Sequence, residues 1–277
     1  MNLLSQIYDP PKKLYFKGDK SLLDKNCIAI VGTRKNSEYG RYLTEKIVEE
    51  LSAYNIVIVS GLARGVDTIA HTSALKNNLP TIAVLGSGLE NIYPKENKNL
   101  AREIADKGLL ISEYENDAAP SKYSFPQRNR IISGISIATV VIEAPESSGA
   151  LITADFALNQ GREIFTVPGD IDRENSKGAL KLLQKSAAHP ICSGHEIMEI
   201  LSIQPSFNLL FPNSSQPPSS LQPDQQKVLN ILTRRGKSID QIMSKTSIPI
   251  SELLIVLSIL EIHNLIGINN GKYFKKC

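Results

Sequence analysis

The sequence predicts an α/β fold in which a doubly wound, mostly parallel sheet is followed by a small winged-helix domain. Six short runs rich in β-branched residues alternate with segments of helical period, and the last part of the chain has the pattern of three helices and a hairpin. A chain of 277 residues is long enough for one large core and a small appendage. We therefore predict an α/β domain at residues 1–203, a linker at 204–222 and a winged-helix-like domain at 223–277.

The predicted strands follow one another with helical segments between them. In chain order they are CIAIV from Cys27, NIVIVS from Asn55, TIAVLG from Thr81, LLIS from Leu109, ATVVIEA from Ala138 and EIFTVPG from Glu163. Strands that alternate with helices in this way form parallel sheets covered on both faces. Each run ends in small or turn residues, such as Gly32 and Gly61. Open α/β sheets bind ligands at the carboxyl ends of their strands, so we predict the functional site there.

The C-terminal part begins after IQPSFNLLFPNSSQPPSSLQP, whose Pro and Ser content is typical of an extended linker. DQQKVLNILTRRG, SIDQIMSKTS and ISELLIVLSILEIH have helical period, and LIGINNGKYFKK predicts a hairpin that turns at Asn269, Asn270 and Gly271. The third helix contains no Lys or Arg, which disfavours a DNA-binding regulator that reads bases through it. We expect this domain to support contacts with a partner or a second copy.

Composition excludes several classes of site. The three cysteines are far apart and form no CxxC, so we interpret them as free thiols in a reducing compartment, and the four histidines lack zinc-ligand spacing. The N-terminus has no signal-peptide pattern and the longest apolar stretch is about half a membrane span, so we expect a cytoplasmic protein without membrane contact. The net charge is only +3, so any anion site must be a local patch.

The glycine-containing turns predict anion binding rather than cofactor binding. VGTRKNSEYG after the first strand lacks GxGxxG spacing, the second strand ends in Ser60 without a carboxylate for a ribose, and no GxxxxGK[ST] occurs. We therefore expect no NAD, no nucleotide cofactor and no P-loop. Glycines at strand ends can let backbone N–H groups approach a phosphate. The alternative is that they only make tight turns.

Basic and aromatic side chains are interleaved along the predicted edge. They are Arg34, Lys35, Tyr39, Arg64, Tyr93, Lys95, Lys122, Tyr123, Phe125, Arg128 and Arg130. A single strand of nucleic acid offers phosphates to such charges and unstacked bases to such rings. The same edge holds Asp67, Glu90, Glu113, Asp117 and Glu143. A solvated surface of mixed sign therefore stays open as an alternative.

Three bonding side chains stand in a row in SFPQRNRIISGIS: Arg128, Asn129 and Arg130. At a loop-to-helix junction the two guanidinium groups would offer planar, charged forks to phosphate oxygens, and the amide would bond backbone or base. The alternative is that one arginine pairs with Glu113 or Glu143 to hold the edge together. Both roles can coexist.

Five segments together resemble the DprA/Smf family of DNA-processing proteins. They are IVGTRKNSEYG, SGLARGVDTIAH, LGSGLENIYPKEN, LLISEYENDAAPSKYSFPQRNRIISGIS and VVIEAPESSGALITADFALNQGREIFTVPGDI, within roughly residues 8 to 190. The resemblance implies an extended Rossmann-like domain, often followed by a winged helix, with the family's N-terminal accessory domain absent here. It also implies binding of single-stranded DNA, homodimerisation through the Rossmann domain, loading of the RecA recombinase during natural transformation, and no enzymatic activity.

The resemblance assigns phosphate contacts to residues of five regions. They are Gly32, Thr33, Arg34, Gly61, Arg64, Lys95, Lys122, Arg128, Asn129, Arg130, Ser148, Gly149 and Thr153. Where relatives tend to have SxGTNxLIxxGA, this chain has SKGALKLLQKSA, without the asparagine and the later glycine. The role of residues 176–187 therefore stays open.

The alternative from another class is a nucleotide hydrolase of the lysine-decarboxylase-like group, which uses a similar sheet. Its PGGxGTxxE turn corresponds to APESSGALITAD here, without the paired glycines and with Thr153 in place of the catalytic glutamate. Glu113, Glu143, Asp67 and His71 could be proposed as acid/base groups. Because none stands in that motif, we prefer structural roles for them.

Overall fold

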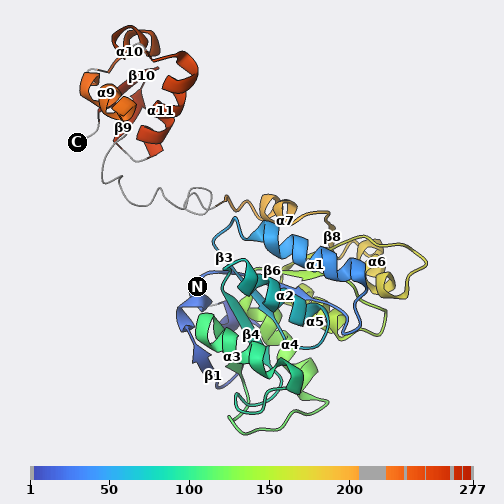
Figure 1. The fold of residues 1–277 in the computed structure, drawn as a ribbon. Helices are drawn as coiled ribbons and strands as arrows, with labels where there is room; N and C mark the ends of the chain where they lie inside the picture. The colour runs from blue at the N-terminus through green and yellow to red at the C-terminus, as the bar shows by residue number, and fades with distance from the viewer. Residues whose placement is uncertain are drawn as a thin grey trace. The chain divides into compact units, whose positions relative to one another are not determined.

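The computed structural model of the chain describes residues 3–205, 223–233, 236–246, 248–262, 265–269 and 271–275. The chain divides into two compact units, residues 1–209 and 210–277 (Figure 1). Most of the predicted linker, residues 206–222, lies outside the described residues. Each unit is considered by itself.

Eight strands of the described residues form one sheet in the N-terminal unit. They are β1 (Tyr15–Gly18), β2 (Asn26–Val31), β3 (Ile56–Ser60), β4 (Thr81–Leu85), β5 (Leu109–Ser112), β6 (Ala138–Val141), β7 (Glu163–Thr166) and β8 (His189–Pro190). Their order across the sheet is β1-β5-β4-β3-β2-β6-β7-β8, and only the β1–β5 pair is antiparallel. The chain changes direction across the sheet between β2 and β6. The carboxyl ends of these two strands therefore flank the crevice in which open α/β sheets bind ligands.

Helices cover both faces of this sheet. One face carries α1 (Glu38–Leu51), α2 (Val66–Lys76), α3 (Lys98–Lys107) and α7 (Gly194–Ile200), and the other carries α4 (Ser124–Ile135), α5 (Gly149–Asn159) and α6 (Lys177–Gln184). Short 3-10 turns are η1 (Leu3–Gln6), η2 (Lys20–Asp24), η3 (Lys95–Asn97) and η4 (Glu174–Ser176). In Figure 1, α2 and α7 lie on either side of α1. The central strands β2 to β6 are thus buried on both sides, which explains their unbroken apolar runs.

The structure confirms the predicted doubly wound α/β fold and all six predicted strands. Two edge strands, β1 and β8, are additional. The prediction that Arg128 stands at a loop-to-helix junction is wrong, because α4 begins four residues earlier, at Ser124. Pro126 is compatible with this helix because it lies in the first turn, where its missing N–H would have no intrahelical acceptor.

The C-terminal unit is a winged-helix domain, as predicted. It contains α9 (Pro223–Ile231), α10 (Ile239–Thr246) and α11 (Ile250–Ile262), followed by a hairpin of β9 (Ile266–Asn269) and β10 (Lys272–Lys275). Its own core includes Val228, Ile242, Leu253, Leu257 and Leu260. The hairpin turns where predicted: Gly271 has φ +71°, a conformation that favours glycine, and Asn270 lies outside the described residues.

Within the described ranges, no single helix is both long and apolar enough to cross a bilayer; α10 and the stretch Ile250–Glu261 meet that criterion only when taken together across a 109° bend. The same part of the chain contains no cluster of His, Cys, Asp and Glu suited to a metal ion. Cys27 and Cys192 are free thiols, and Cys277 lies outside the described residues.

His71 is a fully buried, neutral histidine inside this fold. The Thr81 hydroxyl donates to the Ile58 carbonyl (2.9 Å), so the 2.7 Å contact between His71 Nδ1 and Thr81 Oγ1 places the ring proton on Nδ1. Nε2 is buried and has no hydrogen-bond partner within the described part of the chain. Burial, and to a lesser degree the charge of Arg128, lower the pKa of His71 to about 3.

This burial predicts a loss of stability in mild acid. In the unfolded chain this histidine binds a proton below about pH 6.5, whereas in the folded protein it stays neutral down to about pH 3. The free energy of unfolding therefore falls as the pH drops through that window. Between pH 7 and pH 5 this effect of His71 should lower the free energy of unfolding by ~2 kcal/mol. The variant His71→Gln keeps a polar group near Thr81 but cannot bind this proton. Urea unfolding followed by circular dichroism should show that its free energy of unfolding falls by ~2 kcal/mol less between pH 7 and pH 5 than that of the unmodified protein. An equal loss in both proteins contradicts the assignment.

Candidate nucleic-acid interface

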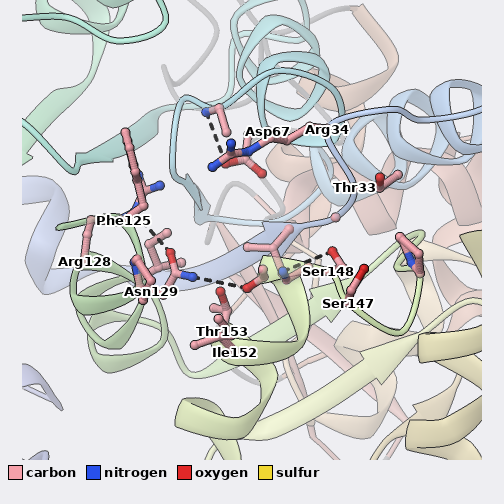
Figure 2. Close-up of a pocket in the computed structure, with 18 of the residues that line it drawn as sticks. Thr33, Arg34, Asp67, Phe125, Arg128, Asn129, Ser147, Ser148, Ile152 and Thr153 are labelled. Carbon is pink, nitrogen blue, oxygen red and sulfur yellow. Dashed lines mark hydrogen bonds between the residues drawn. The ribbon is translucent and has the colours of Figure 1, made fainter. Parts of the chain in front are cut away.

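A cavity of about 560 Å³ opens at the carboxyl ends of β2 and β6, at the crevice where the strand order reverses (Figure 2). Its wall comprises the turn after β2, the first half of α4, and the turn from β6 into α5. The predicted site residues that line it are Gly32, Thr33, Arg34, Lys122, Arg128, Asn129, Ser148, Gly149 and Thr153. The fold thus gathers into one cavity residues that are up to 121 positions apart, from Gly32 to Thr153.

Three exposed cations supply the positive charge of this cavity. Arg34, Lys35 and Lys122 line it and are solvent-exposed, and none of them forms an ion pair with another residue that the structure describes. The N-terminus of α5 adds the partial positive charge of a helix start, capped by Ser148, whose hydroxyl accepts from the Ala150 N–H (3.2 Å). Unneutralised cations around a concave surface suit an anionic ligand.

An aromatic surface stands beside these charges. The Arg34 guanidinium lies over the Phe125 ring, 5.6 Å from its centroid, and the Tyr93 ring lies 5.5 Å from Phe125. Gly86 at the end of β4 makes room for Phe125, because a Cβ there would lie 2.7 Å from the ring. Lys122 covers Tyr123, which is 69% exposed. Flat rings next to cations are suited to stacking unpaired bases.

Arg128 plays a different part from Arg34, because it is buried at the base of the cavity. Its Nη1 donates to the carbonyls of Gly61 and Val84 at the ends of β3 and β4, and its Nε donates to Asn129 Oδ1 (3.2 Å). Burial lowers the pKa of Arg128 to about 10, which still leaves it charged at neutral pH. A guanidinium with these partners joins the two strand ends.

Asp67 balances this buried charge. Its carboxylate accepts from the N–H groups of Gly61 (3.1 Å) and Ala63 (3.3 Å). Burial raises its pKa, and the charge of Arg128 acts in the opposite direction. A Cβ on Gly61 would lie 2.5 Å from Arg128 Nη1, so this glycine makes room for the guanidinium. The N–H of Gly61 is already bonded within the protein. For this glycine the alternative of a structural turn, without phosphate binding, therefore holds.

Arg130 and Asn129 also bond mainly within the protein. Arg130 forms a paired contact with both Glu113 carboxylate oxygens (2.6 and 2.7 Å), and its Nε lies 3.1 Å from Asp9. It is not among the described residues that line the cavity. Asn129 donates to the Gly149 carbonyl (3.2 Å) and so ties α4 to the start of α5. The alternative that one arginine pairs with Glu113 thus holds for Arg130.

Glu143 fixes the turn that carries Arg34. Its carboxylate accepts from the Ser37 hydroxyl (2.5 Å) and N–H (2.9 Å) and from the Asn175 amide (3.3 Å). Its carbonyl accepts from the Thr33 N–H (2.7 Å). With Asp67, Glu113 and His71 bonded as described above, the four groups that could be offered as acids or bases all have structural partners.

The remaining predicted residues lie beside the cavity. Gly61 and Arg64 line a smaller hollow that adjoins it, together with Tyr93 and Phe125. Arg64 pairs with Glu96, and Lys95 is exposed on the adjacent η3 turn. Ile152 also lines the cavity and was not predicted. Its spacing from Gly149, three residues along one helix, was the signal that could have identified it.

Comparison with known proteins agrees with these features. The family model described as DNA recombination-mediator protein A matches residues 1–202, and that of the DprA winged helix domain matches residues 212–272. The chain belongs to the DprA family. Both models describe DNA-processing proteins, so the nucleotide-hydrolase alternative is not favoured.

Individual DprA proteins are similar over most of the chain. DNA processing protein DprA of Bacillus subtilis is 44% identical over 199 residues, which are 72% of this chain and 67% of that protein. The X-ray structure of DprA from Streptococcus pneumoniae matches with a TM-score of 0.69 and 42% identity over 73% of this chain and 70% of that one. DprA of Helicobacter pylori, whose structure concerns its single-stranded DNA binding mode, matches with a TM-score of 0.67 and 36% identity over 72% and 91%.

The contrast between the buried and the exposed arginine predicts different effects on stability. Arg128→Ala removes the donor to two buried carbonyls and the positive charge that offsets the buried Asp67, so it should lower the free energy of unfolding by ~3–5 kcal/mol. Arg34→Ala removes an exposed side chain and one cation–π contact and should change it by less than ~1 kcal/mol. Urea titrations of both variants test this. Similar losses in the two variants would contradict the structural role of Arg128.

Proposed function

We propose that this chain binds single-stranded DNA in the cavity between the ends of β2 and β6. The observation that carries the proposal is the arrangement of Arg34 over Phe125 beside Lys35, Lys122 and the start of α5. Cations take the phosphates, and the exposed rings take bases that a duplex would keep stacked. The structure of the Helicobacter pylori relative concerns that protein's single-stranded DNA binding mode, which supports the same ligand for this chain.

We further propose that the chain acts without turnover as a recombination mediator. It would hold incoming single strands and help to load the RecA recombinase during natural transformation. The family's description as DNA recombination-mediator protein A supports a role in recombination. The engagement of Glu113, Glu143 and Asp67 in structural bonds supports a binding role over catalysis. Phosphate or base release from nucleotides with multiple turnovers would overturn the non-enzymatic part, and unchanged RecA assembly on single strands would overturn the mediator part.

Mutation of the exposed cations should weaken binding and reduce its salt dependence. If about four phosphates are neutralised, log affinity should fall with log salt with a slope of ~3, and Arg34→Ala or Lys122→Ala should each lower that slope by ~0.7. Fluorescence anisotropy with a labelled oligothymidylate measures both, and an unlabelled duplex should compete poorly. Unchanged affinity and slope in both variants would remove this cavity as the site.

We also propose a homodimer formed through the N-terminal unit. β8 ends the sheet of the described residues, and Ile171 (77% exposed) and Ile200 (45%) lie in the same C-terminal part of the unit. A two-fold pair would present two cavities to one strand and gain avidity. Light scattering of residues 1–203 at tens of micromolar should give twice the monomer mass. A strict monomer contradicts the proposal.

A further inference from the structure

Two hollows continue from the cavity along the sheet edge. The first is small and lined in part by Arg34, Phe125, Tyr93 and Arg64; Arg34 and Phe125 also line the cavity, so the two adjoin. The second has a volume of about 280 Å³, is lined by residues of α1 and α2, and shares Arg64 with the first. Arg64 is therefore the next cation that a strand leaving the cavity past Phe125 would meet.

The charge of Arg64 is already neutralised by a carboxylate. Its Nε donates to Glu96 Oε1, and this bond raises the pKa of Arg64 and lowers that of Glu96. The pair is open to water, with 61% of the Arg64 side chain and 52% of the Glu96 side chain exposed. Exposed ion pairs of this kind contribute little to stability, so another anion can displace the carboxylate.

The position of Glu96 is fixed by its neighbour in the chain. Asn97 is buried, and its amide donates to the Leu62 carbonyl (2.9 Å) and to the Thr68 hydroxyl (2.8 Å). These two acceptors flank Arg64 in the sequence. Asn97 therefore holds the η3 turn against the segment that carries Arg64, and Glu96 is kept opposite the guanidinium. The two side chains are therefore kept close because the backbone segments that carry them are held together.

We propose that Glu96 occupies the place on Arg64 that a phosphate of the bound strand takes, and so acts as an intramolecular competitor that lowers DNA affinity. The inference rests on the proposed binding of single-stranded DNA. A carboxylate and a phosphate bond a guanidinium through the same donors. The strand must therefore displace Glu96 before Arg64 can contribute, and the released carboxylate then repels the phosphate that replaced it.

Replacing the carboxylate by an amide should strengthen binding. Glu96→Gln is expected to tighten binding of a labelled 20-residue oligothymidylate about fivefold at low salt. It should also steepen the salt slope by ~0.7, because Arg64 then neutralises one phosphate without leaving an unpaired carboxylate. The matched control is Glu103→Gln on α3: Glu103 pairs with Lys107 at similar exposure, carries the same charge, and lines none of the three hollows.

Two further variants separate the possible outcomes. In the double variant Arg64→Ala/Glu96→Gln the gain should disappear, with affinity within about twofold of the unmodified chain. Equal affinities of Glu96→Gln and Glu103→Gln, or weaker binding by Glu96→Gln, overturn the competitor role. Arg34→Ala is measured in the same assay: if it too leaves binding unchanged, the proposed function fails, whereas a loss there with no gain from Glu96→Gln refutes only the inference about Glu96.

Discussion

Arg128 brings a positive charge into the interior where β3 and β4 end, and the surrounding segments are arranged to satisfy it. The guanidinium donates to two strand-end carbonyls, the negative charge of Asp67 acts on it, and Gly61 makes room for it. A buried charge without such partners would be strongly destabilising. The geometry of the turn that follows β3 is therefore fixed by this one side chain, and the same positive charge helps to keep His71 neutral.

This internal use of charge determines which cations face a ligand. Arg128 and Arg130 bond to carbonyls and carboxylates of the protein, so the charge that faces the cavity comes from Arg34, Lys35 and Lys122. A net charge of +3 over 277 residues is compatible with an anion site because these three are gathered in one concavity at the strand ends. The crevice between β2 and β6 provides that concavity.

The sequence allowed the sheet to be predicted because its central strands are buried on both sides and read as apolar runs. β1 was not predicted because it is a half-exposed edge strand. β8 was not predicted because a strand of two residues is too short to show a periodic pattern. The partners of Arg128, Asn129 and Arg130 were not predictable. Successive helical residues point about 100° apart, so these three bond to the strand ends, to α5 and to Glu113 respectively.

Two glutamates at the same sheet edge differ in role because they differ in burial: one holds a turn in place, and the other can compete with a phosphate. Glu143 is 5% exposed and bonds three donors, so its carboxylate cannot leave without breaking the turn that carries Arg34. Glu96 faces water and bonds one exposed guanidinium, so it can be exchanged for another anion at little cost. The residue type is the same in both places. Access to water therefore determines which carboxylate supports an anion site and which one an anion can displace.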